Sequence, residues 1–263
     1  MLKMRGDILK KKLMVLCAVA IMISTCLTGC KMNSGKIRFG SAGIGGTYQI
    51  FGDTFANLIS SKSKKYNIEV KTTAGSAANL RLLSKDYIQM AVAQMDLIND
   101  AYNRTGIFEN DKKYQGYRAV ASLYTEACQI VVPADSDIQS MDDLEGKKVC
   151  IGEEESGTEQ NALQILNAYG LNERLVDTVN LNYTDAAKKL KSGDIDAFFC
   201  TAGVQTTVIN ELSKQCKIRL VSLDQKGVSR LKKSYKFYTE YTIPAGTYVN
   251  QTKEIKTVGK RLL

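Results

Sequence analysis

Three turns rich in glycine and hydroxyl residues are the parts of this 263-residue sequence best suited to chemistry. They span residues 40–48, 72–80 and 152–159, and each separates an apolar run with strand periodicity from a run with helical periodicity. The first N–H groups of a helix have no partner within the helix, so a helix start binds carboxylate or phosphate. Glycine lets a ligand approach the backbone closely. The three turns therefore predict a site for a small anionic group.

Side chains in these turns supply further candidate contacts. Thr47 opens the helix after the first turn, and Ser76 and Asn79 lie on one face at the start of the next helix. Ser156 and Thr158 stand at the equivalent place in the second half of the chain. Each side chain could instead cap its own helix, and one glycine-rich turn is weak evidence. Recurrence of the turn in both halves favours a ligand site.

The composition excludes several classes of enzyme. Histidine is absent, so no Ser-His or Cys-His nucleophile pair and no His-containing metal site can form. Residues 40–46 follow Gly-x-x-Gly-x-Gly-Gly without a P-loop lysine, which disfavours a nucleotide site. The nearest acid–base candidates are residues 153–155 and the pair Asp194 and Asp196, and such acidic runs are usually solvated surface. We therefore expect no catalytic residue, metal or cofactor, with an extracytoplasmic enzyme as the weaker alternative.

Strand and helix patterns alternate along the chain and position the three turns. Expected strands cover residues 36–41, 66–73, 88–93, 117–123, 127–132, 147–151, 178–182, 195–200 and 218–223, and expected helices cover residues 47–61, 77–84, 158–169, 185–192 and 204–214. A βαβαβ order in each half predicts an α/β fold with open, mainly parallel sheets.

The repeated order predicts two lobes with a central cleft. We expect the first lobe over residues 36–126 and the second over residues 127–250, because two expected strands follow each other closely where the chain would cross between lobes. Ligands of open α/β sheets bind beyond the carboxyl ends of the strands. The turns of the two lobes would therefore face one another across the cleft.

The first thirty residues predict export and lipid attachment. A basic leader and an apolar run over residues 13–27 are typical of a secretory signal peptide, here residues 1–29. The apolar run is shorter than the roughly 20 residues that a membrane-spanning helix needs. The sequence Leu-Thr-Gly-Cys that ends at Cys30 resembles the bacterial lipobox, which implies lipidation of Cys30. Residues 30–35 would then tether an extracytoplasmic protein to the cell membrane.

Charge and cysteine usage give little support to nucleic acid or metal binding. Loss of five Lys/Arg and one Asp with the leader lowers the formal net charge from +9 to +5, and the remaining basic residues form no block. Beyond the leader and Cys30, the chain holds Cys128, Cys150, Cys200 and Cys216, which lack metal-ligand spacing. Buried apolar thiols are the favoured interpretation, and a disulfide remains open in an oxidising compartment.

Six motifs, taken in order, resemble the TAXI family: Gly-Ser-Ala-Gly-Ile-Gly-Gly-Thr-Tyr, Thr-Ala-Gly-Ser-Ala-Ala-Asn-Leu, Ala-Val-Ala-Gln-Met-Asp, Asp-Leu-Glu-Gly-Lys-Lys-Val, Glu-Ser-Gly-Thr-Glu and Gly-Asp-Ile-Asp-Ala-Phe-Phe. TAXI proteins are substrate-binding subunits of tripartite ATP-independent periplasmic (TRAP) transporters and have the type II periplasmic-binding-protein fold. The resemblance covers nearly all of residues 36–259. It implies capture of a small carboxylate or amino acid, such as glutamate or 2-oxoglutarate, and delivery to a membrane permease.

The resemblance also implies ligand-binding residues in both lobes. Those matched by motif are Gly46, Thr47, Tyr48, Ser76, Asn79, Gln94, Ser156, Gly157 and Thr158, with Thr201, Gly203 and Gln205 as weaker candidates. Each of them could instead be a turn or capping residue. The expected partners are a small anionic solute, the TRAP permease and the membrane, and we expect the protein to be a monomer.

The end of the sequence departs from the family pattern. Residues 257–259 resemble the start of the strand that returns to the first lobe, and only four residues follow. We therefore expect residues 251–263 to be a truncated return segment. Two alternative functions stay open at this point, namely a ligand-sensing lipoprotein with the same fold and a non-functional truncated copy.

Overall fold

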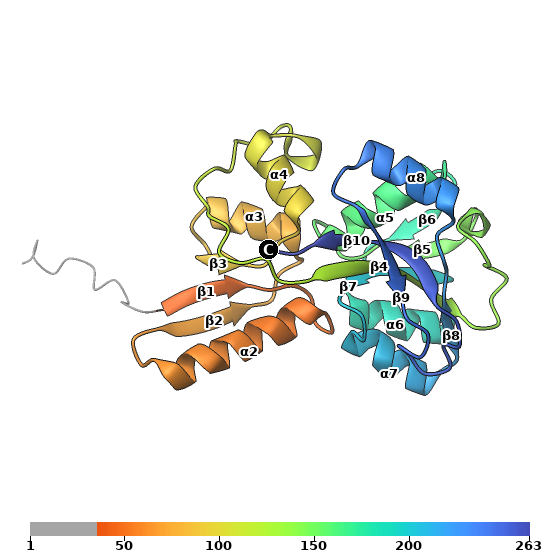
Figure 1. Cartoon of the computed structure of the whole chain (residues 1–263), viewed down its shortest axis with the longest axis horizontal. Coiled ribbons are helices and arrows are strands. Elements are labelled where there is room, and N and C mark those ends of the chain that lie inside the picture. The colour runs from red at the N-terminus through yellow and green to blue at the C-terminus, as the bar shows by residue number, and fades with distance from the viewer. Residues whose placement is uncertain (1–35) are drawn as a thin grey trace, which may run out of the picture. The chain divides into compact units, whose positions relative to one another are not determined.

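A computed structural model describes residues 36–263, and residues 37–263 form one compact unit (Figure 1). The predicted signal peptide of residues 1–29, the lipidation site Cys30 and the tether of residues 30–35 lie outside the described residues. All structural statements below concern residues 36–263.

The first lobe is built on a three-stranded sheet with strand order β2-β1-β3. Strands β1 and β3 run parallel, with Phe39 opposite Met90. In chain order the lobe consists of β1 (Lys36–Gly40), α2 (Thr47–Lys62), β2 (Asn67–Lys71), α3 (Ser76–Ser84), β3 (Met90–Ala91), α4 (Met95–Asn103) and the 3-10 turn η1 (Gly106–Phe108).

Aromatic packing holds helix α2 against this sheet. The ring of Phe39 on β1 lies 6.2 Å from that of Phe51 and 5.8 Å from that of Phe55, which are four residues apart on α2. Gly52 faces Phe39 and Val70, and a Cβ atom there would approach their side chains to 3.3 and 3.1 Å. The small residue therefore lets the helix approach the sheet, which places the start of α2 beside the end of β1.

The second lobe is built on a larger mixed sheet with the order β6-β5-β7-β4-β10-β9, and β8 pairs with β4. Strands β6, β5 and β7 are parallel, while β4 and β10 pair antiparallel with their neighbours. The elements are β4 (Thr125–Pro133), η2 (Asp142–Leu144), β5 (Lys148–Cys150), α5 (Gly157–Ala168), β6 (Asp177–Val179), α6 (Tyr183–Ser192), β7 (Ala197–Ala202), α7 (Thr207–Gln215), β8 (Ile218–Leu220), α8 (Gln225–Ser234), β9 (Thr239–Ile243) and β10 (Ile255–Arg261).

Helices cover both faces of the second sheet. Neighbouring residues of a strand point to opposite faces, so Phe198 and Phe199 of β7 join two separate cores. Helices α5 and α8 pack on the face that holds Phe199, and helices α6 and α7 pack on the face that holds Phe198. Burial on both faces explains why β7 has no exposed position.

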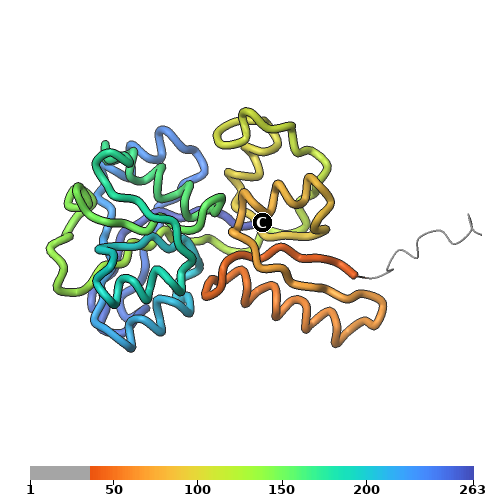
Figure 2. Tube along the Cα trace, turned by 180° about the vertical axis from the view of Figure 1, so that it is seen from behind, coloured from red at the N-terminus to blue at the C-terminus, as the bar shows by residue number. Residues whose placement is uncertain are grey.

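Strands β4 and β10 join the two lobes. Figures 1 and 2 show the two groups of elements side by side, with these strands running between them. Lys260 of β10 pairs with Glu126 of β4 in antiparallel register. Beyond β10, the N–H of Leu262 donates to the carbonyl of Tyr124 at 2.9 Å, and Leu263 exchanges two hydrogen bonds of 3.0 Å with Ala93. The last residues of the chain thus reach the first lobe.

The α/β class and the parallel strands in both lobes were predicted, but several elements differ. The expected strand over residues 117–123 is wrong, because Val120 is exposed there and Tyr117 donates its hydroxyl to the carbonyl of Ile98 instead of entering a sheet. Helix α4 was not expected, because its Asp and Asn residues have low helix propensity. The C-terminal elements α8 and β9 had no expected counterpart in the sequence patterns.

Surface and core chemistry match the composition. Within residues 36–263 no helix is long and apolar enough to cross a membrane, and no group of three acidic or cysteine side chains could hold a metal ion.

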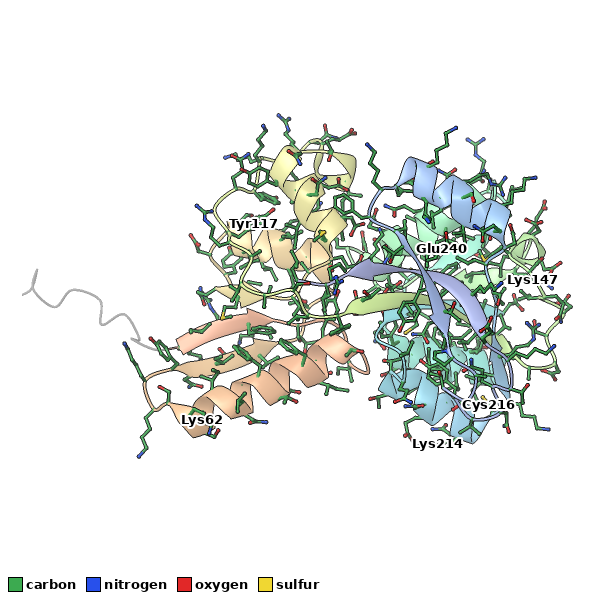
Figure 3. All side chains as sticks on the ribbon, viewed as in Figure 1. Lys62, Tyr117, Lys147, Lys214, Cys216 and Glu240 are labelled. Carbon is green, nitrogen blue, oxygen red and sulfur yellow. The ribbon has the colours of Figure 1, made fainter. Side chains whose placement is uncertain are left out.

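Cys128, Cys150 and Cys200 are buried free thiols, as expected from their apolar surroundings, and Cys216 is a half-buried free thiol. Figure 3 labels exposed charged side chains on α2, α7 and β9, so charge of both signs is spread over separate elements.

Candidate functional site

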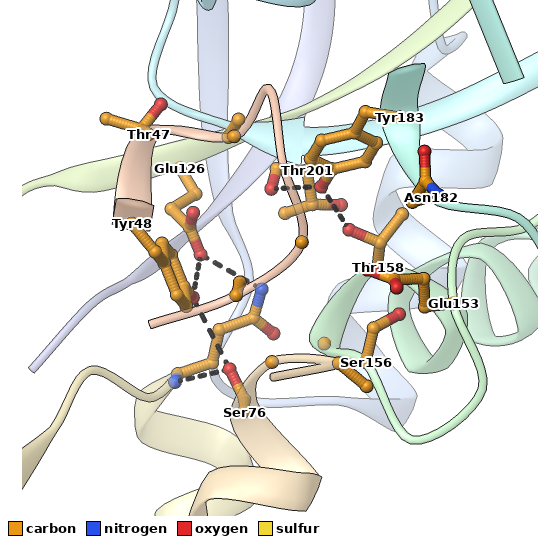
Figure 4. Close-up of a pocket in the computed structure, with 18 of the residues that line it drawn as sticks. Thr47, Tyr48, Ser76, Glu126, Glu153, Ser156, Thr158, Asn182, Tyr183 and Thr201 are labelled. Atoms are coloured by element: carbon orange, nitrogen blue, oxygen red, sulfur yellow. Dashed lines mark hydrogen bonds between the residues drawn. The ribbon is translucent and has the colours of Figure 1, made fainter. Parts of the chain in front are cut away.

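A small cavity lies where the two lobes meet, and residues of both lobes line it (Figure 4). Its volume is about 30 Å³. Nine of the residues expected from sequence line this cavity: Gly46, Thr47, Tyr48, Ser76, Gln94, Ser156, Gly157, Thr158 and Thr201. The fold therefore brings together turns that lie far apart in the sequence.

The first lobe presents the starts of two helices to the cavity. Gly46 precedes α2 and Gly75 precedes α3, and neither helix has a side-chain cap. Gly75 has a φ angle of 126°, a conformation that side chains with a Cβ atom rarely adopt. Uncapped first-turn N–H groups and the positive ends of two helix dipoles favour a negatively charged group of a ligand at this side.

A buried carboxyl group, Glu126, lies between these helix starts and the second lobe. The hydroxyl of Tyr48 donates to Glu126 Oε2 at 2.7 Å, and Gln94 Nε2 donates to the same oxygen at 3.0 Å. Ser76 supports both donors, because its hydroxyl lies 3.3 Å from that of Tyr48 and accepts from the Gln94 backbone N–H at 3.1 Å. Two donors therefore satisfy Glu126 Oε2 within the protein.

The other oxygen of Glu126 has no such partner. Glu126 is fully buried, it lines the cavity, and its Oε1 makes no hydrogen bond among the described residues. Burial raises the pKa of this carboxyl group to about 8, against the lowering effect of its bonds with Tyr48 and Gln94, and nearby Asp96 raises it further. A buried acceptor without a partner is costly, so the site is unfavourable until something pairs with it.

The second lobe contributes helix α5 and a hydroxyl network. Ser156 caps α5 by accepting the Glu159 N–H at 3.0 Å. The hydroxyls of Thr158 and Tyr183 lie 2.5 Å apart, and Tyr183 donates to the carbonyl of Thr201 at 2.9 Å (Figure 4). These groups form the polar wall of the cavity opposite Glu126.

Gly157 lets the two lobes meet at Gln94. A Cβ atom on Gly157 would lie 2.7 to 2.8 Å from the Gln94 side chain, which is too close for an unshifted contact. Gln94 Oε1 also accepts from Asn161 Nδ2 of α5 at 3.1 Å. Gln94 therefore connects Glu126 with the second lobe, and a glycine at the start of α5 is required for that position.

The carboxyl groups of the cavity wall have no basic side chain beside them in the lining. Glu153 lines the cavity as Glu126 does, and burial together with the charge of Asp185 raises its pKa. None of the lining residues is Lys or Arg. Only helix starts and neutral donors are therefore available to a negatively charged group of a ligand in this cavity.

Three expected residues do not line the cavity. Asn79 is fully buried behind it and donates to the carbonyls of Ser41 at 2.7 Å and Val92 at 2.9 Å, so it holds the backbone of the first lobe together. Gly203 packs near Thr47 and Tyr124. Gln205 sits in a left-handed turn with φ of 62°, where its N–H bonds to Tyr248. Gln205 is thus a turn residue, whereas Asn79 lies within helix α3 and is neither a cap nor a turn residue.

Several lining residues were missed by sequence reasoning, above all Glu126, Glu153, Asn182 and Tyr183. Glu126 does carry a sequence signal, because it is a single acidic residue at the start of a long apolar run. Such a residue predicts a paired or functional charge once the run is read as a buried strand. Tyr183 carries no comparable signal, since tyrosine at the start of a helix is unremarkable.

Direct contacts hold the two lobes together beside the cavity. Arg81 of α3 pairs with Glu155 of the second lobe at 2.7 Å, and the hydroxyl of Thr184 donates to the carbonyl of Ile44 at 3.2 Å. The cavity volume is well below the roughly 150 Å³ of a cavity that holds a benzene molecule. A solute the size of an amino acid would therefore fit inside only when the lobes move apart.

Sequence comparison assigns the chain to a family. Residues 39–262 match the profile of the NMT1-like family, which covers both lobes and the connecting strands. The chain belongs to the NMT1-like family.

Solved structures similar to this NMT1-like protein share its fold. A protein from Bordetella bronchiseptica RB50 matches with a TM-score of 0.52 at 17% identity, over 87% of this chain and 63% of the other. A Listeria monocytogenes protein described as an L-cystine ABC transporter matches with a TM-score of 0.50 at 15% identity, over 87% of this chain and 82% of the other. The fold is the two-lobed type II periplasmic-binding-protein fold.

The NMT1-like chain is shorter than some of these proteins. The alkanesulfonate-binding protein SsuA from Xanthomonas axonopodis pv. citri, bound to MOPS, has a TM-score of 0.48 at 17% identity over 72% of this chain. The match spans 60% of that protein and 56% of the aliphatic sulphonate-binding protein SsuA from Escherichia coli.

Proposed function

We propose that this protein is an extracytoplasmic solute-binding protein that captures a small carboxylate or amino acid between its lobes. The observation that carries the proposal is the cavity at the lobe junction, which is lined by the starts of α2, α3 and α5. Two of these starts have no side-chain cap, and a helix start of this kind favours a carboxylate. In α3 the Ala78 N–H already donates to the carbonyl of Glu155 at 3.3 Å, which leaves the N–H groups before it for a ligand. Membership in a family of substrate-binding proteins agrees with this function.

Binding and release would proceed by movement of the lobes. In the proposed division, residues 36–126 form the first lobe, residues 127–250 form the second, and residues 251–263 return to the first. A solute binds one lobe of the open form, and the second lobe then completes the contacts, so that solute shifts the population towards the closed form. The strands β4 and β10 would act as the hinge, because they pass between the lobes.

The partner in this proposal is a membrane permease of the TRAP type. The proposal follows the ordered motifs that resemble the TAXI family, with Cys30 as the lipid anchor that keeps the protein near the permease. A closed, solute-loaded form would dock on the permease and release its cargo there. The solute's carboxylate would lie at the helix starts of the first lobe, where Gly46, Thr47, Tyr48 and Ser76 line the cavity.

The experiment that tests this function combines scattering with calorimetry on the mature chain. Titration of small carboxylates and amino acids should identify a solute with micromolar or tighter affinity. Small-angle scattering of the same sample should show a decrease in the radius of gyration when the solute saturates the protein. A tightly bound solute that leaves the radius of gyration unchanged, or binding that survives substitution of the cavity wall, would contradict the proposal.

A further inference from the structure

Glu126 offers a hydrogen-bond acceptor to the cavity that no protein group uses. Its Oε2 already accepts from Tyr48 and Gln94, whereas its Oε1 is buried without a partner and the residue lines the cavity. Both protein donors point at one oxygen, which leaves Oε1 as an acceptor when the group is ionised and as an O–H donor when it is protonated. A hydrogen-bond donor on the bound solute would give Oε1 the partner that the protein does not supply.

The charges around Glu126 leave it without a counter-ion. Lys260 is opposite Glu126 on the neighbouring strand, but its ammonium group is bound to Asp96 and donates to Gln164 at 2.9 Å. The charges of Lys260 and Asp96 cancel each other, so an ionised Glu126 gives this region a net negative charge. Because the cavity wall contains Glu153 and no Lys or Arg, no side chain of the wall balances that charge, and a cationic group of the solute would.

The unpaired oxygen of Glu126 and its lack of a counter-ion together indicate which solute the site prefers. This inference rests on the function proposed above. We infer that Glu126 binds a protonated amine of the solute, so that the site takes an amine-bearing carboxylate such as an α-amino acid and rejects the corresponding 2-oxo acid. The carboxylate lies at the uncapped starts of α2 and α3, and the ammonium group donates to Glu126 Oε1. Glu126 is then a specificity-determining residue.

If Glu126 donated a hydrogen bond to the solute instead of accepting one, the affinity would depend on pH in the opposite direction. A protonated Glu126 could donate to a carboxylate of the solute, and binding would then weaken as the pH rises. An ammonium group instead requires ionised Glu126, so the protein releases a proton on binding and the affinity rises by up to about tenfold per pH unit below pH 8. The sign of this dependence separates the two arrangements.

The phenols and thiols near Glu126 do not obscure this dependence. The neighbouring titratable groups are the phenols of Tyr48, Tyr124 and Tyr183, the thiols of Cys128 and Cys200, and the ion pair of Asp96 and Lys260. Burial raises the pKa of each of these phenols and thiols, which keeps them protonated between pH 6 and pH 8. The other acidic side chain of the cavity wall is Glu153, whose pKa is raised by burial and by Asp185, so loss of the pH dependence in the variant Glu126→Gln is what assigns it to Glu126.

The test uses matched pairs of probes with the mature protein. Isothermal titration calorimetry is carried out with L-alanine and pyruvate, L-leucine and 4-methyl-2-oxopentanoate, and L-glutamate and 2-oxoglutarate, at pH 6, 7 and 8. We expect one amino acid to bind more tightly than its 2-oxo acid, with an affinity that rises with pH. The variant Glu126→Gln should lose roughly 10- to 150-fold in affinity at pH 8, as expected for a hydrogen bond to a charged group. The variant Glu240→Gln, at an exposed position on β9, should bind like the wild type.

The outcomes separate the inference from the function on which it rests. Tighter binding of a 2-oxo acid, an affinity that falls with pH, or unchanged binding in Glu126→Gln would overturn the role of Glu126 and leave a solute-binding protein in place. Failure of the wild type to bind any of the six probes would overturn the proposed function for this class of solute, and the inference with it. The preference for an amino acid over its 2-oxo acid and the pH dependence of the affinity are measured on the wild type, so these results do not depend on the folding of a variant.

Discussion

A single carboxyl group, Glu126, couples the stability of this protein to its site. Its pKa rises from 4.5 to about 8 because folding removes it from water. The folded state therefore binds more protons than the unfolded state between these two pKa values. Stability linked to Glu126 is complete below about pH 4.5 and is lost as the pH rises towards 8.

The first prediction concerns the stability of the Glu126→Gln variant. An uncharged amide can accept from Tyr48 and Gln94 without the cost of a buried charge. We expect the variant to be more stable than the wild type by roughly 3 kcal/mol at pH 7, with a difference that shrinks towards zero at pH 4.5. Urea unfolding at pH 5, 6, 7 and 8 measures this difference. A variant that is less stable than the wild type at pH 7 would show that the buried carboxyl is paired in some other way.

The second prediction concerns Gly157 at the start of α5. A methyl group in Gly157→Ala would displace the Gln94 side chain, which would break its bonds to Glu126 and Asn161. We expect the affinity for the solute to fall by about tenfold or more, since each such hydrogen bond contributes about 1 kcal/mol. Gly116→Ala is the matched control, because a Cβ atom there meets nothing within 4 Å. Equal affinities in the two variants, measured by calorimetry, would contradict the contact.

At the scale of elements, three helices of the second lobe begin with a side-chain cap, and the caps of α5 and α6, Ser156 and Asn182, line the cavity, whereas the cap of α8 does not. Ser156 caps α5 at the cavity wall, and Asp224 caps α8 by accepting from the Gly227 N–H at 2.9 Å. Asp224 is not among the lining residues of the cavity. Variants at these two caps therefore separate the contribution of a cap to stability from its contribution to solute binding.

The third prediction compares Ser156→Ala with Asp224→Ala. Loss of either cap should lower the free energy of unfolding by about 1 kcal/mol, because one first-turn N–H loses its acceptor. Only Ser156→Ala should also weaken solute binding. Urea unfolding and calorimetry on the same preparations test both statements. If Asp224→Ala weakened binding as much as Ser156→Ala, the effect would come from general loss of stability.

At the scale of the whole molecule, a buried ion pair connects elements of both lobes. Lys260 of β10 is 1% exposed and binds Asp96 of α4, which is 5% exposed, while Gln164 of α5 accepts a further hydrogen bond from Lys260. The ammonium group also lies 4.0 Å from the ring centre of Tyr238. First lobe, hinge strand and second lobe therefore meet at one charged group.

The fourth prediction concerns Lys260→Met. Removal of the ammonium group leaves Asp96 buried without a counter-ion, so we expect a loss of about 3 to 5 kcal/mol in the free energy of unfolding. The double variant Lys260→Met/Asp96→Leu should recover most of that loss, because it leaves no unpaired charge. Urea unfolding of the single and double variants forms the test. A loss of less than about 1 kcal/mol in the single variant would mean that water reaches Asp96.

The sequence by itself determined the α/β class and the strand-turn-helix units that begin α2, α3 and α5. Strand, glycine-rich turn and helix are local patterns, so the starts of α2, α3 and α5 were expected close to their observed positions. Local patterns also explain the failures. The apolar and aromatic residues of 117–123 have strand propensity, but they do not enter either sheet.

Only the tertiary structure decided which polar side chains line the cavity and with what charge. Asn79 was expected to face a ligand and instead bonds to buried carbonyls, while Glu126 and Glu153 line the cavity without having been expected there. Whether Glu126 is neutralised depends on Lys260, which folding places opposite it and then pairs with Asp96. Burial and charge pairing depend on residues that lie far apart along the chain. They cannot be predicted from the spacing of residues in the sequence, because they arise when the strands β4 and β10 bring the two lobes together.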